Sequence, residues 1–379
     1  MTKAENTYFA GLPVALVEEM LAKSGEIGKE IYEIISKISA DRGKLRDQLL
    51  EKNIIRKDAN KEEIAATSVC GIDGCYAIEK CINAGLVCCA AFATEGTIPP
   101  SGTRLWETPA YKTMIHIEEQ NAEIAGILRA IMMEMEIELA AGAPHGIILL
   151  NGSYITPFVT LMETLKQALE TKASTVSQEF ISRIKTFIQS YKTIFNSENT
   201  NQIWVGMPKN VSKQELVSTL HLPDHYDNKT FLTILLSPGE YTTPLPVDKS
   251  EIFRVNSIPI KDEKFAAVRE SLVSFLSKLR FIYYRPYEWM PAMRIEISET
   301  VTKNETQFAL LLNSIKFQCC NAGLKEPYPI YHASTLANRM KSAIPSILRL
   351  STSSITNLPM NDKSGILQLL LLNDSYTGD

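Results

Sequence analysis

The stretch that most constrains the fold is Ser68–Glu95, where two short apolar segments flank one carboxylate set between glycines. Ser68–Ile72 and Leu86–Ala93 are rich in small and β-branched residues, which is typical of buried strands. Asp73 follows the first segment within the sequence GIDG, and glycines allow a tight turn or a close approach of another group. Two interpretations follow: an Asp-Gly hairpin turn, or a carboxylate held by a sheet as a first ligand for a hard cation.

A second predicted strand downstream ends in similar residues. Gly146–Leu150 is followed by Asn151 and a glycine, and a helical stretch predicted from about residue 113 to 141 carries Glu134. Two-metal phosphodiester hydrolysis requires several oxygen ligands around a pair of divalent ions. Asp73, Glu134 and position 151 are side chains of the right kind, although position 151 is an amide.

The rest of the chain alternates predicted helices and strands. Residues 14–50 carry a helical period of isoleucines and leucines, with a break near Gly43, and are expected to form a packing or dimerisation arm. Further predictions are helices over 159–200 with a break at 174–177, a strand over 202–207, a strand hairpin over 278–298, a helix over 305–322 and an apolar helix or strand from about 365. His221 and His225 have Pro223 between them, which argues against a helical two-histidine metal site.

Charge gives no whole-molecule sign of nucleic-acid binding, because the net charge is −4 and the pI is near 5.9. DNA binding would therefore need a local basic surface or a partner. The best candidate is 278–298, where Arg280, Arg285 and Arg294 interleave with aromatic residues. Such a hairpin can offer cations and stacking rings to a single strand, or its aromatics can alternate into the core. Lys209 is a further candidate for a phosphate contact.

Composition places the protein in the intracellular, non-membrane class. No apolar run approaches the roughly 18 residues that span a bilayer, and the N-terminus lacks a signal-peptide pattern. The seven cysteines form no C-x-x-C pair, so core thiols in a reducing compartment are expected rather than a zinc site.

Taken in order, these pieces resemble the NurA family of prokaryotic nucleases, which work with the HerA hexameric DNA translocase. The matching pieces are Leu12-Pro13 with the helical arm, GIDG at 71–74, the glutamate-bearing helix before LLNGS at 149–153, WVGMPK at 204–209, LLSPGEYTTP at 235–244, the YYRP…RIEI hairpin and a C-terminal Tyr/Pro/His segment. They run from about residue 10 to 345. Each piece is loose by itself, and the ordered set is the more specific signal.

The resemblance implies an α/β fold with an RNase H-like mixed sheet core flanked by helices, a long N-terminal helical arm and helical insertions. The implied domains are an arm at 1–60 for dimer or partner contacts, a nuclease domain at 61–350 and a C-terminal segment at 351–379. It also implies a cytoplasmic homodimer that degrades DNA ends with Mn²⁺ or Mg²⁺, as a 5′-to-3′ exonuclease and single-strand endonuclease, beside a HerA-type ATPase. Repair and antiviral defence are both compatible roles.

The resemblance also implies the site residues. Asp73 and Glu134 match the first two acidic metal ligands of the family, and Asn151 stands where the family has a second Asp. Tyr328 matches the C-terminal Tyr, and the family His corresponds to His332 or, on another alignment, to Asn338.

Asn151 departs from the family pattern, since an amide keeps the shape but loses the charge that holds a cation. Three explanations stay open: a deliberate Asp-to-Asn replacement, a naturally weakened or inactive relative, and a site that works with an amide. The alternative function is a non-catalytic subunit that threads DNA or regulates the translocase. An unrelated helical scaffold is a more remote third interpretation.

Overall fold

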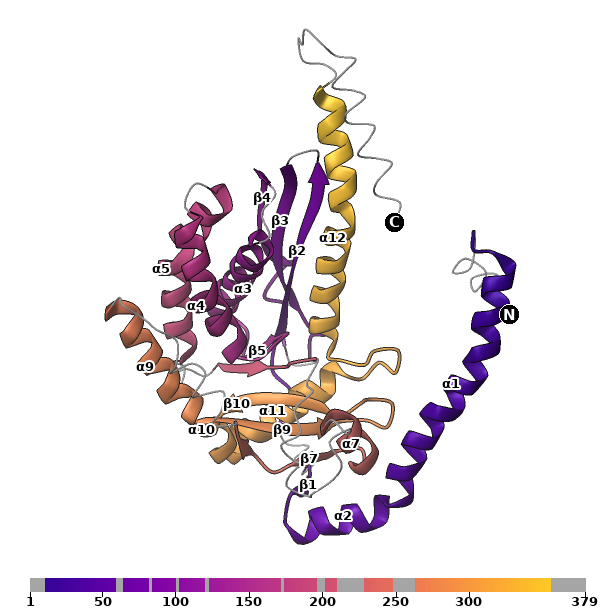
Figure 1. Ribbon diagram of the computed structural model, residues 1–379. Coiled ribbons are helices and arrows are strands. Elements are labelled where there is room, and N and C mark those ends of the chain that lie inside the picture. Colours follow the sequence, from indigo (N-terminus) through magenta and orange to yellow (C-terminus); the bar gives the residue numbers. More distant parts are fainter. Residues whose placement is uncertain are drawn as a thin grey trace.

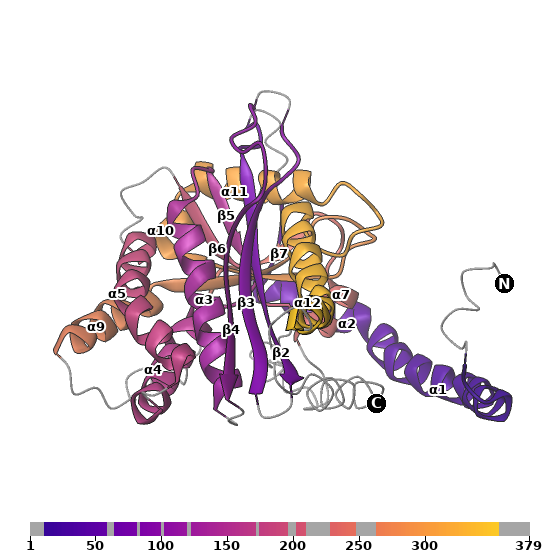
Figure 2. The same ribbon diagram turned by 90° about the horizontal axis from the view of Figure 1, so that it is seen from above.

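A computed structural model describes residues 11–58, 64–81, 84–99, 102–119, 123–171, 174–195, 202–209, 228–247 and 263–355. Within these residues the chain forms one mixed sheet of ten strands, in the order β1-β7-β9-β10-β6-β5-β2-β3-β4, with β8 paired to β9. Helices lie on both faces of the sheet (Figures 1 and 2). The predicted mixed α/β sheet flanked by helices is confirmed, and its assignment as RNase H-like stays a prediction.

The strands are β1 (Ile55–Lys57), β2 (Val69–Cys81), β3 (Ala84–Glu95), β4 (Ala110–Glu119), β5 (Ile147–Leu150), β6 (Ile203–Gly206), β7 (Glu240–Thr242), β8 (Leu245–Pro246), β9 (Leu279–Arg285) and β10 (Met293–Ser298). The helices are α1 (Val14–Ala40), α2 (Arg42–Glu51), α3 (Ile124–Gly142), α4 (Ile155–Glu170), α5 (Thr175–Phe195), α7 (Asn228–Leu235), α9 (Glu263–Ser277), α10 (Glu299–Lys303), α11 (Glu305–Gln318) and α12 (Tyr328–Ile355). The predicted hairpin at 278–298 is confirmed as β9 and β10. The predictions at 221–225 and beyond 355 lie outside the described residues.

The two apolar segments that open the sheet form one long antiparallel hairpin. β2 continues past Asp73 to Cys81, which pairs with Ala84, so the chain reverses there and not at the Asp-Gly pair. The Asp-Gly turn is therefore wrong as an interpretation. Asp73 lies opposite Phe92 of β3, one residue past the last pair that β2 forms with β5, so β3 holds its backbone in place.

Side chains of β2 alternate between two different helical layers. Cys70 and Ile72 belong to the core that packs on α3, α4 and α5. Gly71 faces α12 instead, because a Cβ on it would overlap the Pro329 carbonyl group. Figure 2 shows the sheet edge-on between these layers, with α3, α4 and α5 on one side and α12 on the other.

One predicted helix is partly wrong. The stretch expected to be helical from residue 113 is strand β4 as far as Glu119, and α3 begins only at Ile124. In β4 the buried Met114 and Glu118 alternate with exposed side chains, so pairing with β3 decided the local structure in place of the helical period.

The N-terminal arm leaves the body of the protein, as Figure 1 shows for α1. The predicted break near Gly43 is confirmed at residue 41, between α1 and α2. At its base the Arg46 guanidinium binds both carboxylate oxygens of Glu240, at 2.7 and 2.6 Å, and such a two-point contact fixes orientation. β1 pairs with β7 inside the predicted arm 1–60, and α12 crosses the predicted boundary at 350. None of the described helices is long and apolar enough to cross a membrane.

Candidate metal centre

The residues that follow the parallel-paired parts of β2, β5 and β6 form a row across the sheet. Ile72 pairs with Leu150, and Leu150 pairs with Gly206. The ladder continues one step further, because the Asn151 N–H donates to the Ile72 carbonyl at 3.0 Å and the Met207 N–H donates to the Leu150 carbonyl at 2.9 Å. Asp73, Asn151 and Met207 are thus side by side at one level of three strands. The structure brings together the first and third predicted ligands.

The carboxylate nearest this row from helix α3 belongs to Glu136. A Cβ on Gly74 would lie 2.7 Å from Glu136 Oε1 and 2.7 Å from Met132 Cγ. Met132 and Glu136 are one turn apart, so this face of α3 packs directly on Gly74. The Gly74 N–H also donates to Asp73 Oδ1 at 3.0 Å. Gly74 therefore gives the space that the Glu136 carboxylate occupies on the α3 face of β2, whereas Asp73 extends from the face that Gly71 shares with α12.

The surroundings of Glu136 disfavour the ionised form of its carboxyl group. Burial raises its pKa well above the usual value, and the negative charge of Asp73 raises it further. The Gly74 N–H and the Arg129 guanidinium act in the opposite direction. The two carboxylates repel each other through space, and a cation bound near them would reduce that cost.

The structure places the predicted ligand Glu134 on a different side of α3. Its side chain is 1% exposed, and its Oε2 lies 3.0 Å from Arg183 Nη1 of α5. Burial raises the pKa of Glu134 to about 7, and the nearby Arg183 charge lowers it only in part. Residues two apart in a helix point in nearly opposite directions. Glu136, which sequence reasoning missed, is therefore the α3 carboxylate whose ionisation the Asp73 charge affects.

The loop after Asn151 is fastened to β10. Ser153 Oγ donates to Glu296 Oε2 at 2.8 Å, and Glu296 Oε1 lies 3.1 Å from Arg294 Nε. Arg294 is 2% exposed, and its guanidinium lies 3.9 Å from the centre of the Phe281 ring. The structure accounts for Arg294 as part of the core that positions this loop, and its burial closes it to a DNA phosphate.

Tyr328 and His332 lie one turn apart at the start of α12, with ring centroids 5.7 Å apart. α12 packs along β2 on the face that carries Gly71, and Thr94 Oγ1 donates to the Pro329 carbonyl at 2.7 Å. Both predicted side chains are thus on the helix that covers the Asp73 face. Asn338, the other candidate for the family histidine position, is exposed on the same helix.

The other predicted DNA contacts have protein partners. Arg285 donates to four backbone carbonyls, those of Thr233, Leu236, Glu288 and Met290. Arg280 pairs with Glu299 at 2.7 Å. The hairpin aromatics Phe281, Tyr283 and Tyr284 are buried, as the core interpretation predicted.

Lys209 is the predicted cation closest to the row. It follows Met207 by two residues, pairs with Glu326 at 2.9 Å and donates to Ser334 Oγ at 2.7 Å. Its side chain is 38% exposed, so it stays available to solvent and to a phosphate.

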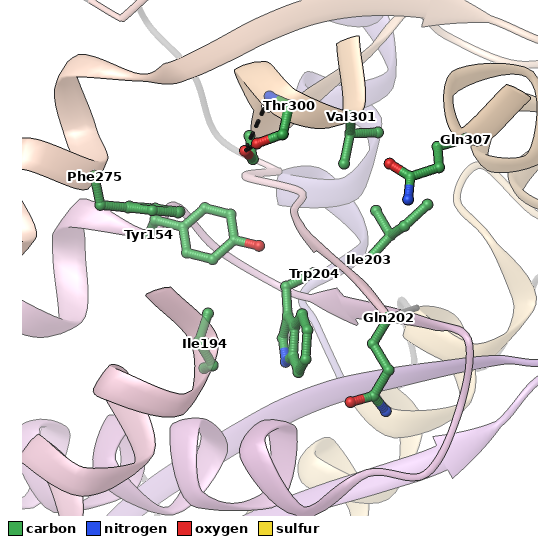
Figure 3. A pocket seen from close by; sticks show the side chains of 10 residues that line it. Tyr154, Ile194, Gln202, Ile203, Trp204, Phe275, Thr300, Val301 and Gln307 are labelled. Carbon is green, nitrogen blue, oxygen red and sulfur yellow. Dashed lines mark hydrogen bonds between the residues drawn. The ribbon is translucent and has the colours of Figure 1, made fainter. Parts of the chain in front are cut away.

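A small hollow on another side of the protein is a poor candidate for this chemistry. Figure 3 shows it between Tyr154, Trp204 and Phe275. The other lining residues are Ile194, Gln202, Ile203, Ser298, Thr300, Val301 and Gln307. None of these lining side chains carries a charge, so the hollow has no ligand for a cation and no counter-charge for a phosphate.

Comparison with known proteins identifies the architecture. No protein-family sequence model and no curated protein sequence matches the chain. Among solved structures, the NurA nuclease from Sulfolobus solfataricus matches with a TM-score of 0.58 and 14% identity, over 89% of this chain and 97% of that one. The chain has the NurA fold. A second NurA crystal structure matches with a TM-score of 0.50 and 10% identity, over 91% of this chain and 99% of that one.

The donor set of this NurA-like chain suits a hard divalent cation. Carboxylate and amide oxygens are ligands of Mg²⁺ and Mn²⁺, and the space at Gly74 is shaped for the Glu136 carboxylate. Within the described ranges, no group of three or more His, Cys, Asp or Glu side chains is placed to hold a metal ion. Asp73 and Glu136 supply two carboxylates, and Asn151 stands in the third place without a charge.

Four of the seven cysteines, Cys70, Cys88, Cys89 and Cys319, are core residues as predicted, whereas Cys75 and Cys81 are half-buried and Cys320 is exposed. Cys70, Cys89 and Cys319 are buried, and burial raises the pKa of each thiol. A raised pKa disfavours the thiolate that binds metals and attacks substrates. The described structure contains free thiols and assigns them to packing.

Proposed function

We propose that this chain is a metal-dependent DNA nuclease of the NurA type. The observation that carries the proposal is the level that Asp73 shares with Asn151 on a NurA fold, with Glu136 packed on the adjacent Gly74 near enough for the Asp73 charge to raise its pKa. We extend the proposal to a homodimer that degrades DNA ends beside a HerA-type hexameric ATPase, as a 5′-to-3′ exonuclease and single-strand endonuclease. Asp73 and Glu136 replace Asp73 and Glu134 as the proposed carboxylate ligands.

The chain's own residues would act by holding and positioning. Asp73 and Glu136 would hold Mn²⁺ or Mg²⁺, and Asn151 would offer its carbonyl oxygen at the third place. When bound, the ion supplies Lewis-acid stabilisation of the charge that develops on the scissile phosphate. Lys209 adds a positive charge two residues beyond Met207, and the bond from Ser153 to Glu296 holds the Asn151 loop in position.

A second candidate function is a catalytically inactive subunit that binds or threads DNA. The specific observation in its favour is Asn151, because an amide gives no negative charge where cation binding needs a third one. The two candidates share the fold, and they differ in the chemistry expected of the chain as it stands.

Cleavage of labelled linear DNA with Mn²⁺ separates the two. The chain as given is compared with Asn151→Asp and with Asp73→Ala, each with and without the HerA-type ATPase. Cutting only by Asn151→Asp establishes the nuclease mechanism and makes position 151 its switch. Cutting by the given chain that Asp73→Ala abolishes shows a working amide, and no cutting by any variant leaves the inactive subunit.

A further inference from the structure

A cavity of about 390 Å³ opens beside the proposed metal centre, at the end of the row that Asp73 begins. Met207, the third member of the row, lines it together with the start of α12. Neighbouring strands lie about 4.8 Å apart, so Met207 is about 10 Å from Asp73 across two strand spacings. A strand of DNA with one phosphate at Asp73 would bring a neighbouring nucleotide to this cavity.

The cavity is lined by more positive than negative side chains. Lys209, Lys229 and Lys325 line it, against the single carboxylate of Glu326; the lining residue Arg294 does not count, because it is buried and paired with Glu296. The whole chain carries a net charge of −4, so this lining reverses the overall sign. A concave surface of one sign concentrates counter-charged ligands.

Two of the lysines are held in place by neutral groups. Lys229 Nζ donates to the Lys209 carbonyl at 2.9 Å, and Lys325 Nζ donates to the Trp289 carbonyl at 2.9 Å. An ammonium group has three donors, and a backbone carbonyl does not neutralise its charge. Lys229 and Lys325 are therefore positioned cations that lie on separate segments of the chain and that sequence reasoning did not select.

The first turn of α12 adds to the same end of the cavity. Ile330 and Tyr331 line it, and Tyr331 is 44% exposed. Backbone N–H groups at a helix start favour an anion, and an exposed ring offers a stacking surface to a base. The cavity thus combines cations with one accessible aromatic side chain.

We propose that this cavity is a phosphate-binding subsite for the DNA strand next to the cleaved position, in which Lys229 and Lys325 bind the phosphate. This inference rests on the proposed function, since it takes Asp73 and Glu136 as the place of cleavage. The shared chemistry is a phosphate group, which an internal phosphodiester or the terminal phosphate of a DNA end can supply.

The test measures binding without cleavage. Fluorescence anisotropy of a labelled single-stranded oligonucleotide is recorded in EDTA over a series of salt concentrations, for the full chain and for Lys229→Gln and Lys325→Gln. Glutamine keeps a donor and removes the charge. Each variant is expected to bind about tenfold more weakly. The slope of log K against log salt should fall by about 0.7 for each phosphate that the variant no longer neutralises.

Lys303→Gln is the matched control. Its side chain is 72% exposed on α10, which follows the far end of β10 from the cavity, so the salt slope should equal that of the unchanged protein. If Lys229→Gln and Lys325→Gln also keep the slope of the unchanged protein, the subsite is overturned.

Two further measurements are needed. The first distinguishes an internal phosphate from a terminal one, and the second distinguishes the subsite proposal from the nuclease proposal. Oligonucleotides with a 5′-phosphate and a 5′-hydroxyl are compared: a lysine effect on both indicates internal phosphates, and an effect on the phosphorylated one alone indicates the end. Cleavage by Asn151→Asp with Mn²⁺ is measured separately. Cleavage with unchanged slopes removes the subsite and leaves the nuclease, whereas reduced slopes without cleavage remove the nuclease and leave a DNA-binding cavity.

Discussion

Gly74 and Glu136 fit together as a space and the group that fills it. A Cβ at Gly74 would stand 2.7 Å from Glu136 Oε1, so β2 and α3 approach each other at a position that has no side chain. The glycine after Asp73 is thereby explained by the approach of a second carboxylate, and the turn expected from Asp-Gly is not needed.

Gly74→Ala should disrupt this approach. The new methyl group would also lie 2.9 Å from the Ala90 carbonyl oxygen of β3, so strand β3 and the facing α3 side chains must shift, and overpacking of this kind costs about 1–3 kcal/mol. Urea unfolding and Mn²⁺ titration should show lower stability and weaker Mn²⁺ binding. Gly85→Ala is the control, because its nearest contact would be an ordinary 3.4 Å from Ile78. Equal effects from both substitutions would contradict the role given to Gly74.

The choice between the two glutamates can be measured directly. Glu136→Gln should weaken Mn²⁺ binding, followed by calorimetry or electron paramagnetic resonance, at least tenfold, and Glu134→Gln should leave it nearly unchanged. Asn151→Asp should strengthen binding because it adds a third negative charge. Weaker binding in Glu134→Gln and not in Glu136→Gln would show that Glu134, and not Glu136, binds the metal with Asp73.

Mn²⁺ affinity should rise with pH. The pKa of Glu136 is raised well above its usual value by burial and by Asp73, and a carboxyl group must lose its proton to bind a cation. Affinity should therefore be low where Glu136 is protonated and should increase as the pH approaches that raised pKa. The Glu136→Gln variant should lose this dependence. An affinity that is flat with pH in the unchanged protein would show that Glu136 is not a ligand.

Glu134 should make folding stability fall as the pH rises from about 4.5 to about 7. Its pKa is near 7 in the folded protein, so the folded state holds a proton that the unfolded chain has released across this window. The difference corresponds to about 3 kcal/mol. Urea unfolding at pH 5 and pH 8 should show that Glu134→Gln gains stability relative to the unchanged protein at the higher pH. A constant difference between the two proteins at both pH values would refute the shift.

Arg294→Met should cost about 3–5 kcal/mol, because it leaves Glu296 buried without its partner. Adding Glu296→Gln should recover part of that loss, and chemical denaturation of both variants measures it. If the single variant instead keeps its stability and loses only DNA affinity, Arg294 is a DNA contact and not a core residue.

The sequence was sufficient for the strands whose apolar runs are short and flanked by glycine or proline. β3, β5 and β6 are buried over most of their length, and β2 is buried over Val69–Ile72, so composition identifies them. β4 was not identified, because its exposed Ile115 and Ile117 resemble a helical stripe until the pairing with β3 is known.

The candidate site was partly predictable for a related reason. Asp73 and Asn151 follow strand segments, and adjacent parallel strands bring such residues to one level. The choice among Glu134, Glu136 and Glu138 depends on which face of α3 packs on β2. That face could not be predicted from the sequence. The one usable signal was Gly74, which marks a close approach without naming its partner. α12 was also missed, since Pro345 lies inside it and proline usually ends a helix.

The covering of β2 by α12 has a consequence for how the protein is made. Thr94 and the Pro329 carbonyl that it binds are 235 residues apart, and chains grow at about 5–20 residues per second. The face of the sheet that holds Asp73 therefore waits roughly 10–50 s for its cover to leave the ribosome. Pulse proteolysis of stalled nascent chains should show this face protected only in chains that extend well past residue 330, so an unfinished product would be a target for chaperones.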